Sequence, residues 1–304
     1  MKSLLRRLAL LVPTILGVVT LIFFLIHFIP GDPVELMLGE TASTADLERL
    51  RADLGLDLPV AEQFGTFLLG FVRGDLGNSF FYRRPVVEVI LEKLPATLEL
   101  AAAAMVLALL LALPLGIVAA VRKDSFTDRA AMLASLVGIS MPNFWLGPLL
   151  IILFSIKLGW LPVSGREGAA SIVLPALTLG TALAALLSRM TRSAMLDVLG
   201  EDYLRTARAK GLSEKVVIVK HAFRNALLPV LTIVGLQFGA LLSGAVITEN
   251  VFAWPGIGSL LIQAINTRDY PMVQGCVLVI SLGYVAANFL TDLLYSLSDP
   301  RVKV

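Results

Sequence analysis

The chain has 304 residues and a formal net charge of only +2. Charged residues make up 16% of it, against about 25% in soluble proteins, and 57% of the residues are hydrophobic. This composition excludes an ordinary soluble protein, and the near-neutral charge gives no indication of a nucleic-acid partner.

Six long stretches contain no Asp, Glu, Lys or Arg, and they predict six transmembrane helices. A helix needs about 20 apolar residues to cross the hydrocarbon core of a bilayer, and each stretch is long enough. We therefore expect an all-α integral membrane protein. The stretches are 8–31, 100–121, 130–156, 168–188, 225–248 and 270–291.

The first part of the chain, residues 1–31, combines a short basic terminus with the first apolar stretch. This stretch is too long for a cleaved secretory signal, so we expect it to remain as a membrane anchor. Residues 32–94 follow as a predicted external segment. Helical patterning is visible there in "TADLERLRADLG" (44–55) and "VAEQFGTFLLGFV" (60–72).

Residues 95–292 form the predicted membrane core, which holds the other five spans and a cytoplasmic loop over 189–224; residues 293–304 are a cytoplasmic tail. The uncharged run 250–267 is rich in Gly and amide side chains. We expect it to contain a short amphipathic helix that does not span the membrane. Its predicted apolar face consists of Ile257, Leu260, Leu261, Ala264 and Ile265.

The distribution of Lys and Arg predicts the orientation of the chain. With a cytoplasmic N-terminus, the inner segments carry sixteen Lys and Arg, whereas the short outer segments carry three. Basic residues accumulate on the cytoplasmic side of membrane proteins, so we expect both termini to be cytoplasmic.

Several functions are disfavoured by what the sequence lacks. A proton-driven carrier or a cation channel with a carboxylate ring requires ionisable residues within the membrane. No Asp, Glu, Lys or Arg lies within the predicted spans. Hydrolase and metalloprotease motifs are absent, and so is a phosphate-binding G-x-x-x-x-G-K-[ST] loop. Uphill transport would therefore need energy from another polypeptide.

The stretch "GEDYLRTARAKGLSEK" (200–215) is unusually charged for so apolar a chain. Residues 193–211 read as one helix, which Gly211 can end in a left-handed conformation. Ser213 suits the N-cap of a second short helix, "EKVVIVKHAF", which starts at Glu214. We expect a compact cytoplasmic projection that can transmit a push from a soluble partner into the membrane.

The surrounding stretch "EDYLRTARAKGLSEKVVIVKHAFRNALLPVL" (201–231) resembles the signature loop of binding-protein-dependent ABC transporter permeases. The resemblance is to the branch that imports dipeptides, oligopeptides, glutathione or nickel. It extends to "IPGDP" (29–33), "ENVFAWPGIG" (249–258) and "DLLYSLSDPR" (292–301). In the wider family the loop reads Glu-Ala-Ala, then Gly, then Ile-x-Leu-Pro; here those places are held by Arg205, Thr206 and Ala207, by Gly211, and by His221, Phe223 and Arg224.

The resemblance implies a type I ABC importer permease fold in a bacterial cytoplasmic membrane. It also implies a second, similar permease, two ATP-binding subunits and an external solute-binding protein as partners. ATP and Mg²⁺ would bind to the partner ATPases, and this non-catalytic chain would carry no cofactor. The implied ATPase-coupling residues are Arg205, Thr206, Ala207, Gly211, Leu212, Ser213, Glu214, His221 and Arg224.

The expected cargo is a dipeptide or oligopeptide, and Asn143, Gln237 and Ser243 are candidates for lining its path because they are uncharged polar groups within spans. Hydrogen bonding between helices explains each of them equally well. Glutathione and nickel remain alternatives within the family, and a stand-alone carrier or channel remains one outside it. Nickel favours imidazole and thiolate ligands, and the scatter of His27, His221 and Cys276 along the chain disfavours a nickel site.

Overall fold

The computed structural model describes residues 2–27, 33–38 and 43–298. Within them every regular element is helical, apart from one isolated bridge between Asn78 and Pro85. The chain divides into two compact units, Met1–Thr97 with Pro255–Val285, and Leu98–Trp254 with Ala286–Val304. The expectation of an all-α membrane fold is confirmed.

The first unit contains four N-terminal helices, which are α1 (Lys2–His27), α2 (Pro33–Leu38), α3 (Thr44–Asp53) and α4 (Val60–Arg73). The two helical patterns predicted for the external segment are confirmed as α3 and α4. Ser43 caps α3 by accepting a hydrogen bond from the backbone N–H of Asp46. α4 packs on α1 through aromatic contacts of Phe23 with Phe64 and Phe67.

The first unit also contains α12 (Ile257–Asn266) and the beginnings of α5 (Val86–Val121) and α13 (Tyr270–Ser298). α12 confirms the short helix predicted within 250–267, and Ile257, Leu260 and Ala264 are buried as expected. Ile265 differs, because it is 45% exposed. Buried side chains of α5, α12 and α13 share one apolar core: Val86, Val89, Ile90, Ile257, Leu260, Ala264, Met272, Val273 and Cys276.

Four helices are long and apolar enough to cross a membrane, at Val86–Val121, Ala169–Leu199, Glu214–Leu242 and Tyr270–Thr291. They correspond to the spans predicted at 100–121, 168–188, 225–248 and 270–291. α5 begins at Val86, directly after Pro85, rather than near residue 100. The boundary predicted between residues 94 and 95 therefore lies inside this helix. The first predicted span corresponds to α1, whose apolar portion is Leu11–Phe24.

The span predicted at 130–156 is not one continuous helix. α6 (Phe126–Ser140) and α7 (Asn143–Leu150), which continues as a π-helical segment over Ile151–Lys157, meet at an angle of 102°. The cause is Pro142, which lacks a backbone N–H and disfavours helical geometry at the preceding residue. Met141 is accordingly extended, with φ −84° and ψ 116°.

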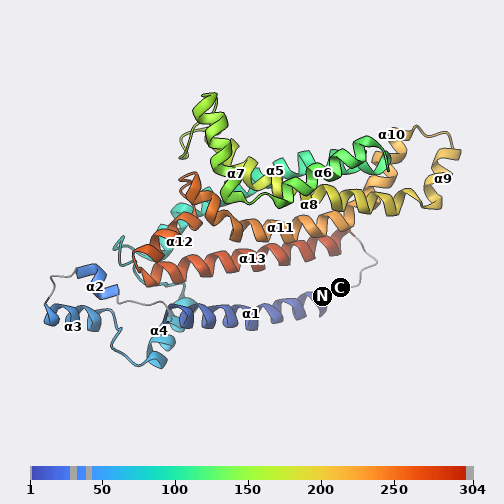
Figure 1. The fold of residues 1–304 in the computed structure, drawn as a ribbon. Coiled ribbons are helices and arrows are strands. Elements are labelled where there is room, and N and C mark those ends of the chain that lie inside the picture. The colour runs from blue at the N-terminus through green and yellow to red at the C-terminus, as the bar shows by residue number, and fades with distance from the viewer. Residues whose placement is uncertain (1, 28–32, 39–42, 299–304) are drawn as a thin grey trace. The chain divides into compact units, whose positions relative to one another are not determined.

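The second unit is built around α8 (Val173–Leu199), which packs against α6 and against α11 (Phe223–Val251) (Figure 1). Small residues allow the helices to approach closely, as is common inside membranes. A Cβ added at Gly116 of α5 would lie 2.6 Å from the Cβ of Thr191 in α8, and one at Gly138 of α6 would lie 2.9 Å from the Cβ of Ala185.

Candidate functional site

The 189–224 segment begins as an extension of α8. This helix continues to Leu199, past the end predicted at residue 188. The prediction of a single helix across 193–211 is wrong. α8 ends at Leu199, and Glu201 is extended, with φ −72° and ψ 143°. A separate short helix, α9 (Asp202–Ala209), follows.

The turn after α9 has the predicted conformation. Gly211 has φ +80°, a left-handed value that glycine adopts without the steric penalty of other residues. Ser213 occupies the N-cap position of α10 (Glu214–Val216), and its carbonyl oxygen accepts hydrogen bonds from the N–H groups of Val216 and Val217. Its side chain makes no capping hydrogen bond.

The second short helix is not separate from the following span, contrary to the prediction. α10 passes through a π-helical segment, Val217–Ala222, directly into α11. No helix-breaking residue lies between Glu214 and Asn225 to interrupt it. A movement of α10 would therefore act on α11 without an intervening loop, and π-helical turns are frequent at functional sites.

The inner face of the segment is fixed to the long helices by apolar packing. Leu204 and Ala207 of α9, together with Val217 and Ala222, are buried. They share one core with residues of α5, α8 and α11, namely Ala120, Ala194, Met195, Ala226 and Val230. The segment is thus held against three helices, and a displacement of α9 acts directly on the end of α8.

Polar contacts connect α9 to the residues after the turn. The guanidinium of Arg208 donates to Glu214 at 2.7 Å. The side-chain amide of Asn225 donates to the Tyr203 hydroxyl at 2.7 Å, and that hydroxyl donates to the backbone oxygen of His221 at 3.4 Å.

The outer face of the segment exposes apolar side chains between basic ones. Leu212, in the turn before α10, is 40% exposed, and Val216 and Val219 in the helical residues that follow are 37% and 54% exposed. The flanking basic residues are Lys210, Lys215 and Lys220, all exposed. An apolar strip with a basic rim suits a protein partner.

The sequence-predicted coupling residues differ in their exposure. Ala207 is buried and His221 is partly exposed. The others lie on the exposed surface: Arg205, Thr206, Gly211, Leu212, Ser213, Glu214 and Arg224.

The three candidates for lining the substrate path lie in α7 and α11. Asn143 is the first residue of α7, and Gln237 lies in α11; both side chains are partly exposed. The side chains of Ser243 and His27 lie outside the described residues.

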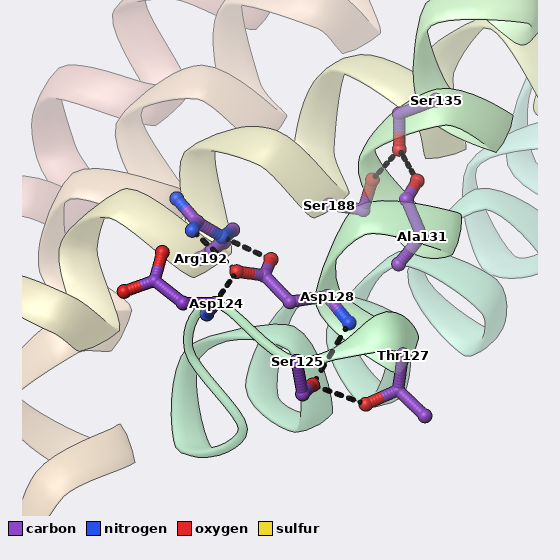
Figure 2. A network of polar contacts seen from close by, with 8 residues as sticks. All are labelled: Asp124, Ser125, Thr127, Asp128, Ala131, Ser135, Ser188 and Arg192. Atoms are coloured by element: carbon purple, nitrogen blue, oxygen red, sulfur yellow. Dashed lines mark hydrogen bonds and ion pairs between the residues drawn. The ribbon is translucent and has the colours of Figure 1, made fainter.

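A polar network that sequence reasoning missed joins α6 to α8 (Figure 2). Asp128 in the first turn of α6 receives two hydrogen bonds from Arg192 of α8, at 2.6 and 2.7 Å. The backbone N–H of Asp124 donates to the same carboxylate at 2.9 Å, and the N–H of Asp128 donates to the Ser125 hydroxyl at 3.3 Å. The pattern Ser-x-x-Asp at 125–128 indicates the start of α6, and it gives no indication of the partner Arg192.

Family models match both parts of the chain. Residues 112–304 match the model described as "Binding-protein-dependent transport system inner membrane component", and residues 1–101 match its N-terminal counterpart.

Curated relatives match along nearly the whole length. The glutathione transport system permease protein GsiC of Pectobacterium atrosepticum is 45% identical over 298 residues, covering 98% of this chain and 97% of the relative. The di/tripeptide permease protein DppB of Pseudomonas aeruginosa is 47% identical over 328 residues, covering 98% and 97%. The dipeptide permease protein DppB of Escherichia coli strain K12 is 44% identical over 335 residues, covering 100% and 99%.

Among solved structures, an inward-facing form of the MetNI methionine ABC transporter shares the fold. Its TM-score is 0.59 at 18% sequence identity, and the match covers 70% of this chain and 97% of the other. At this identity the likeness concerns the fold alone.

Proposed function

The chain belongs to the family of binding-protein-dependent transport system inner membrane components, and from this premise we propose that it imports short peptides with energy from ATP. It is a multi-pass permease subunit of the inner membrane. The observation that carries the proposal is its similarity, over almost its full length, to permeases named for dipeptides, di/tripeptides and glutathione.

In the proposed mechanism, partner ATPases act on the 189–224 segment. The exposed strip of Leu212, Val216 and Val219 would contact an ATPase, and the buried face would pass the movement to α8 and α11. ATP and Mg²⁺ would bind to two ATPase subunits, since this sequence contains no phosphate-binding loop. Both termini and this segment would then be cytoplasmic.

The substrate path would lie between this chain and a second, similar permease, and an external solute-binding protein would deliver the cargo. Asn143 and Gln237 are proposed to line this path. Their uncharged amides can hydrogen-bond a peptide backbone without holding its charged ends.

Glutathione, itself a modified tripeptide, is a second candidate cargo. The alignment with GsiC spans 298 residues and 98% of this chain, so it contains almost no gaps. The alignment with Escherichia coli DppB spans 335 residues, more than the 304 of this chain, so DppB contains residues without a counterpart here. The sequence identities to the two permeases are nearly equal, at 45% and 44%, so glutathione and dipeptides are both proposed as cargo.

The proposal is tested by reconstituting the chain with its partner permease, ATPases and binding protein in vesicles. Uptake of labelled dipeptide and labelled glutathione is measured with and without ATP. We expect ATP-dependent uptake of at least one of them, and the preferred cargo decides between the two candidates. Uptake of neither, by a complex that hydrolyses ATP, would contradict the proposed function.

Gly211→Val tests the role of the turn in the same assay. A β-branched residue at φ +80° costs about 1–2 kcal/mol or more, so the turn before α10 would distort and uptake would be lost. Gly200→Val is the matched control, since Gly200 is exposed in the same segment and has φ −81°. Equal uptake by both variants would argue against coupling through this turn.

A further inference from the structure

The ion pair between Asp128 and Arg192 is buried at the start of α6. The Asp128 side chain is 4% exposed and that of Arg192 is 23% exposed. Both guanidinium hydrogen bonds are charge-assisted and share one carboxylate, which gives the contact a fixed direction as well as strength.

The same carboxylate also fixes the loop that enters α6. It accepts a hydrogen bond from the backbone N–H of Asp124, whose φ of +63° is left-handed, a conformation that Asp adopts more often than most residues other than glycine. Figure 2 shows Asp124 and Arg192 converging on Asp128 from the loop and from α8. One side chain therefore joins the loop after α5, the first turn of α6 and the end of α8.

Arg192 lies in the last part of α8, which forms the beginning of the 189–224 segment. Met195 lies three residues further along α8 and is fully buried, in the same core as Leu204 and Ala207 of α9. A displacement of α9 thus reaches α8 within one helical turn of Arg192. The ion pair connects this part of α8 to the first turn of α6.

Two further contacts hold α6 to α8 beyond the ion pair. The hydroxyls of Ser135 and Ser188 are hydrogen-bonded at 2.8 Å (Figure 2). Gly138 lies against Ala185, and a Cβ added at Gly138 would be only 2.9 Å from the Cβ of Ala185. α6 ends two residues later, at the bend of Met141 and Pro142. α6 is therefore attached to α8 from its first turn to its last.

We propose that Asp128 and Arg192 are positioning residues that make α6 move together with the end of α8 when an ATPase acts on the 189–224 segment. This inference rests on the proposed function. At the first turn of α6 the pair fixes the register of the two helices, because both guanidinium hydrogen bonds end on one carboxylate. Without the pair, ATP hydrolysis continues but its movement no longer reaches α6 and the bend at Pro142.

The test compares variants in the reconstituted complex, with uptake per ATP hydrolysed as the readout. The main variant is the double replacement Asp128→Leu with Arg192→Met, which leaves no unpaired buried charge and removes one further contact, the acceptor of the Asp124 N–H. We expect its ATP hydrolysis to stay within about twofold of wild type while uptake per ATP falls about tenfold. Asp128→Glu, which keeps the charge pair, is expected to retain more than half of the wild-type ratio.

Glu99→Gln provides the matched control. Glu99 and Arg166 form an ion pair in the same unit, also at 2.6 Å, but their side chains are 46% and 41% exposed. We expect this variant to keep the wild-type ratio. Thermal unfolding of each complex distinguishes a loss of coupling from a loss of stability.

The outcomes separate the two proposals. A wild-type complex that transports, with an unchanged uptake per ATP in the Leu–Met double variant, would overturn the positioning role alone. An equal fall in ATP hydrolysis and uptake, together with a lower unfolding temperature, would do the same by showing a purely structural role. A wild-type complex that hydrolyses ATP but takes up no peptide would overturn the proposed function and this inference with it.

Discussion

Asp269 in the first compact unit and Asp128 in the second are both buried aspartates at the start of a helix, yet their donors differ. Asp269 precedes α13 and receives hydrogen bonds from the Ser79 hydroxyl and from the backbone N–H groups of Phe81 and Met272. Asp128 receives a guanidinium and one backbone N–H.

The difference indicates what each carboxylate does. The partial positive charge at a helix N-terminus, with neutral donors, is sufficient to hold the Asp269 carboxylate in place. Its partners Ser79 and Phe81 belong to the loop before α5, so it fixes a loop. Asp128 lies inside the first turn of α6, after the N-cap Ser125, and adds Arg192 from a distant helix. The added cation joins two long helices, which is the arrangement expected where movement is transmitted.

The largest expected effect is on stability when the buried pair is broken on one side. Asp128→Ala leaves Arg192 without its partner, and we expect the free energy of unfolding to fall by about 3 kcal/mol. The double variant Asp128→Leu with Arg192→Met should lose less, about 1 kcal/mol, because only the Asp124 N–H is left without its acceptor. Thermal unfolding in detergent measures both. An equal loss in the two variants would show that packing at this position, rather than an unpaired charge, is decisive.

Close helix approach also distinguishes the two units. In Gly116→Ala the new methyl would meet the Cβ of Thr191 and the backbone oxygen of Ser188, at 2.7 Å, so we expect a loss of about 2 kcal/mol. In Gly275→Ala the three nearest atoms would be side-chain carbons of Val86, Ile90 and Leu76, which move more easily than backbone, so we expect about 1 kcal/mol. The reverse order in the same unfolding assay would contradict this account of helix packing.

Removing a neutral donor from Asp269 should have a smaller and local effect. Ser79→Ala deletes one hydrogen bond to the carboxylate and the one that the Ser79 hydroxyl accepts from the N–H of Tyr82. We expect a loss of about 1 kcal/mol. Amide hydrogen exchange should accelerate at Phe81 and Tyr82 and stay unchanged in the 189–224 segment. Acceleration throughout the chain would show that this loop supports more than its own conformation.

The smallest effect is expected at the exposed ion pair of the second unit. Glu99→Gln removes the charge that pairs with Arg166, and we expect a change of about 0.5 kcal/mol because water screens the pair. Raising the salt concentration should weaken the wild-type contact similarly. A loss as large as that of Asp128→Ala would show that ion-pair distance, not burial, sets the energy.

The sequence was sufficient for features that depend on local chemistry. Gaps between charges located the spans, because a bilayer core excludes charge over its whole thickness. Gly211 was correctly predicted as left-handed, since glycine alone adopts this conformation without strain. α3, α4 and α12 were visible from the periodicity of their apolar residues.

Other features depend on competition between neighbours that a pattern does not resolve. Pro142 bends a span that composition alone makes continuous, whereas Pro229 lies within the unbroken helix α11. The helix predicted across 193–211 is interrupted at Gly200, although the φ of Gly200, −81°, is an ordinary helical value. The pairing of Asp128 with Arg192, 64 residues apart, has no local signal and became apparent only when the helices were packed.

The most direct test of ATP-driven import asks whether transport depends on the exposed strip of the 189–224 segment. The triple variant Leu212→Ser, Val216→Ser, Val219→Ser changes only side chains that reach the surface, so the fold should persist. In reconstituted vesicles we predict that wild type accumulates labelled peptide only with ATP, and that the variant accumulates none. Accumulation against a gradient by the purified chain alone, without nucleotide, would contradict the account.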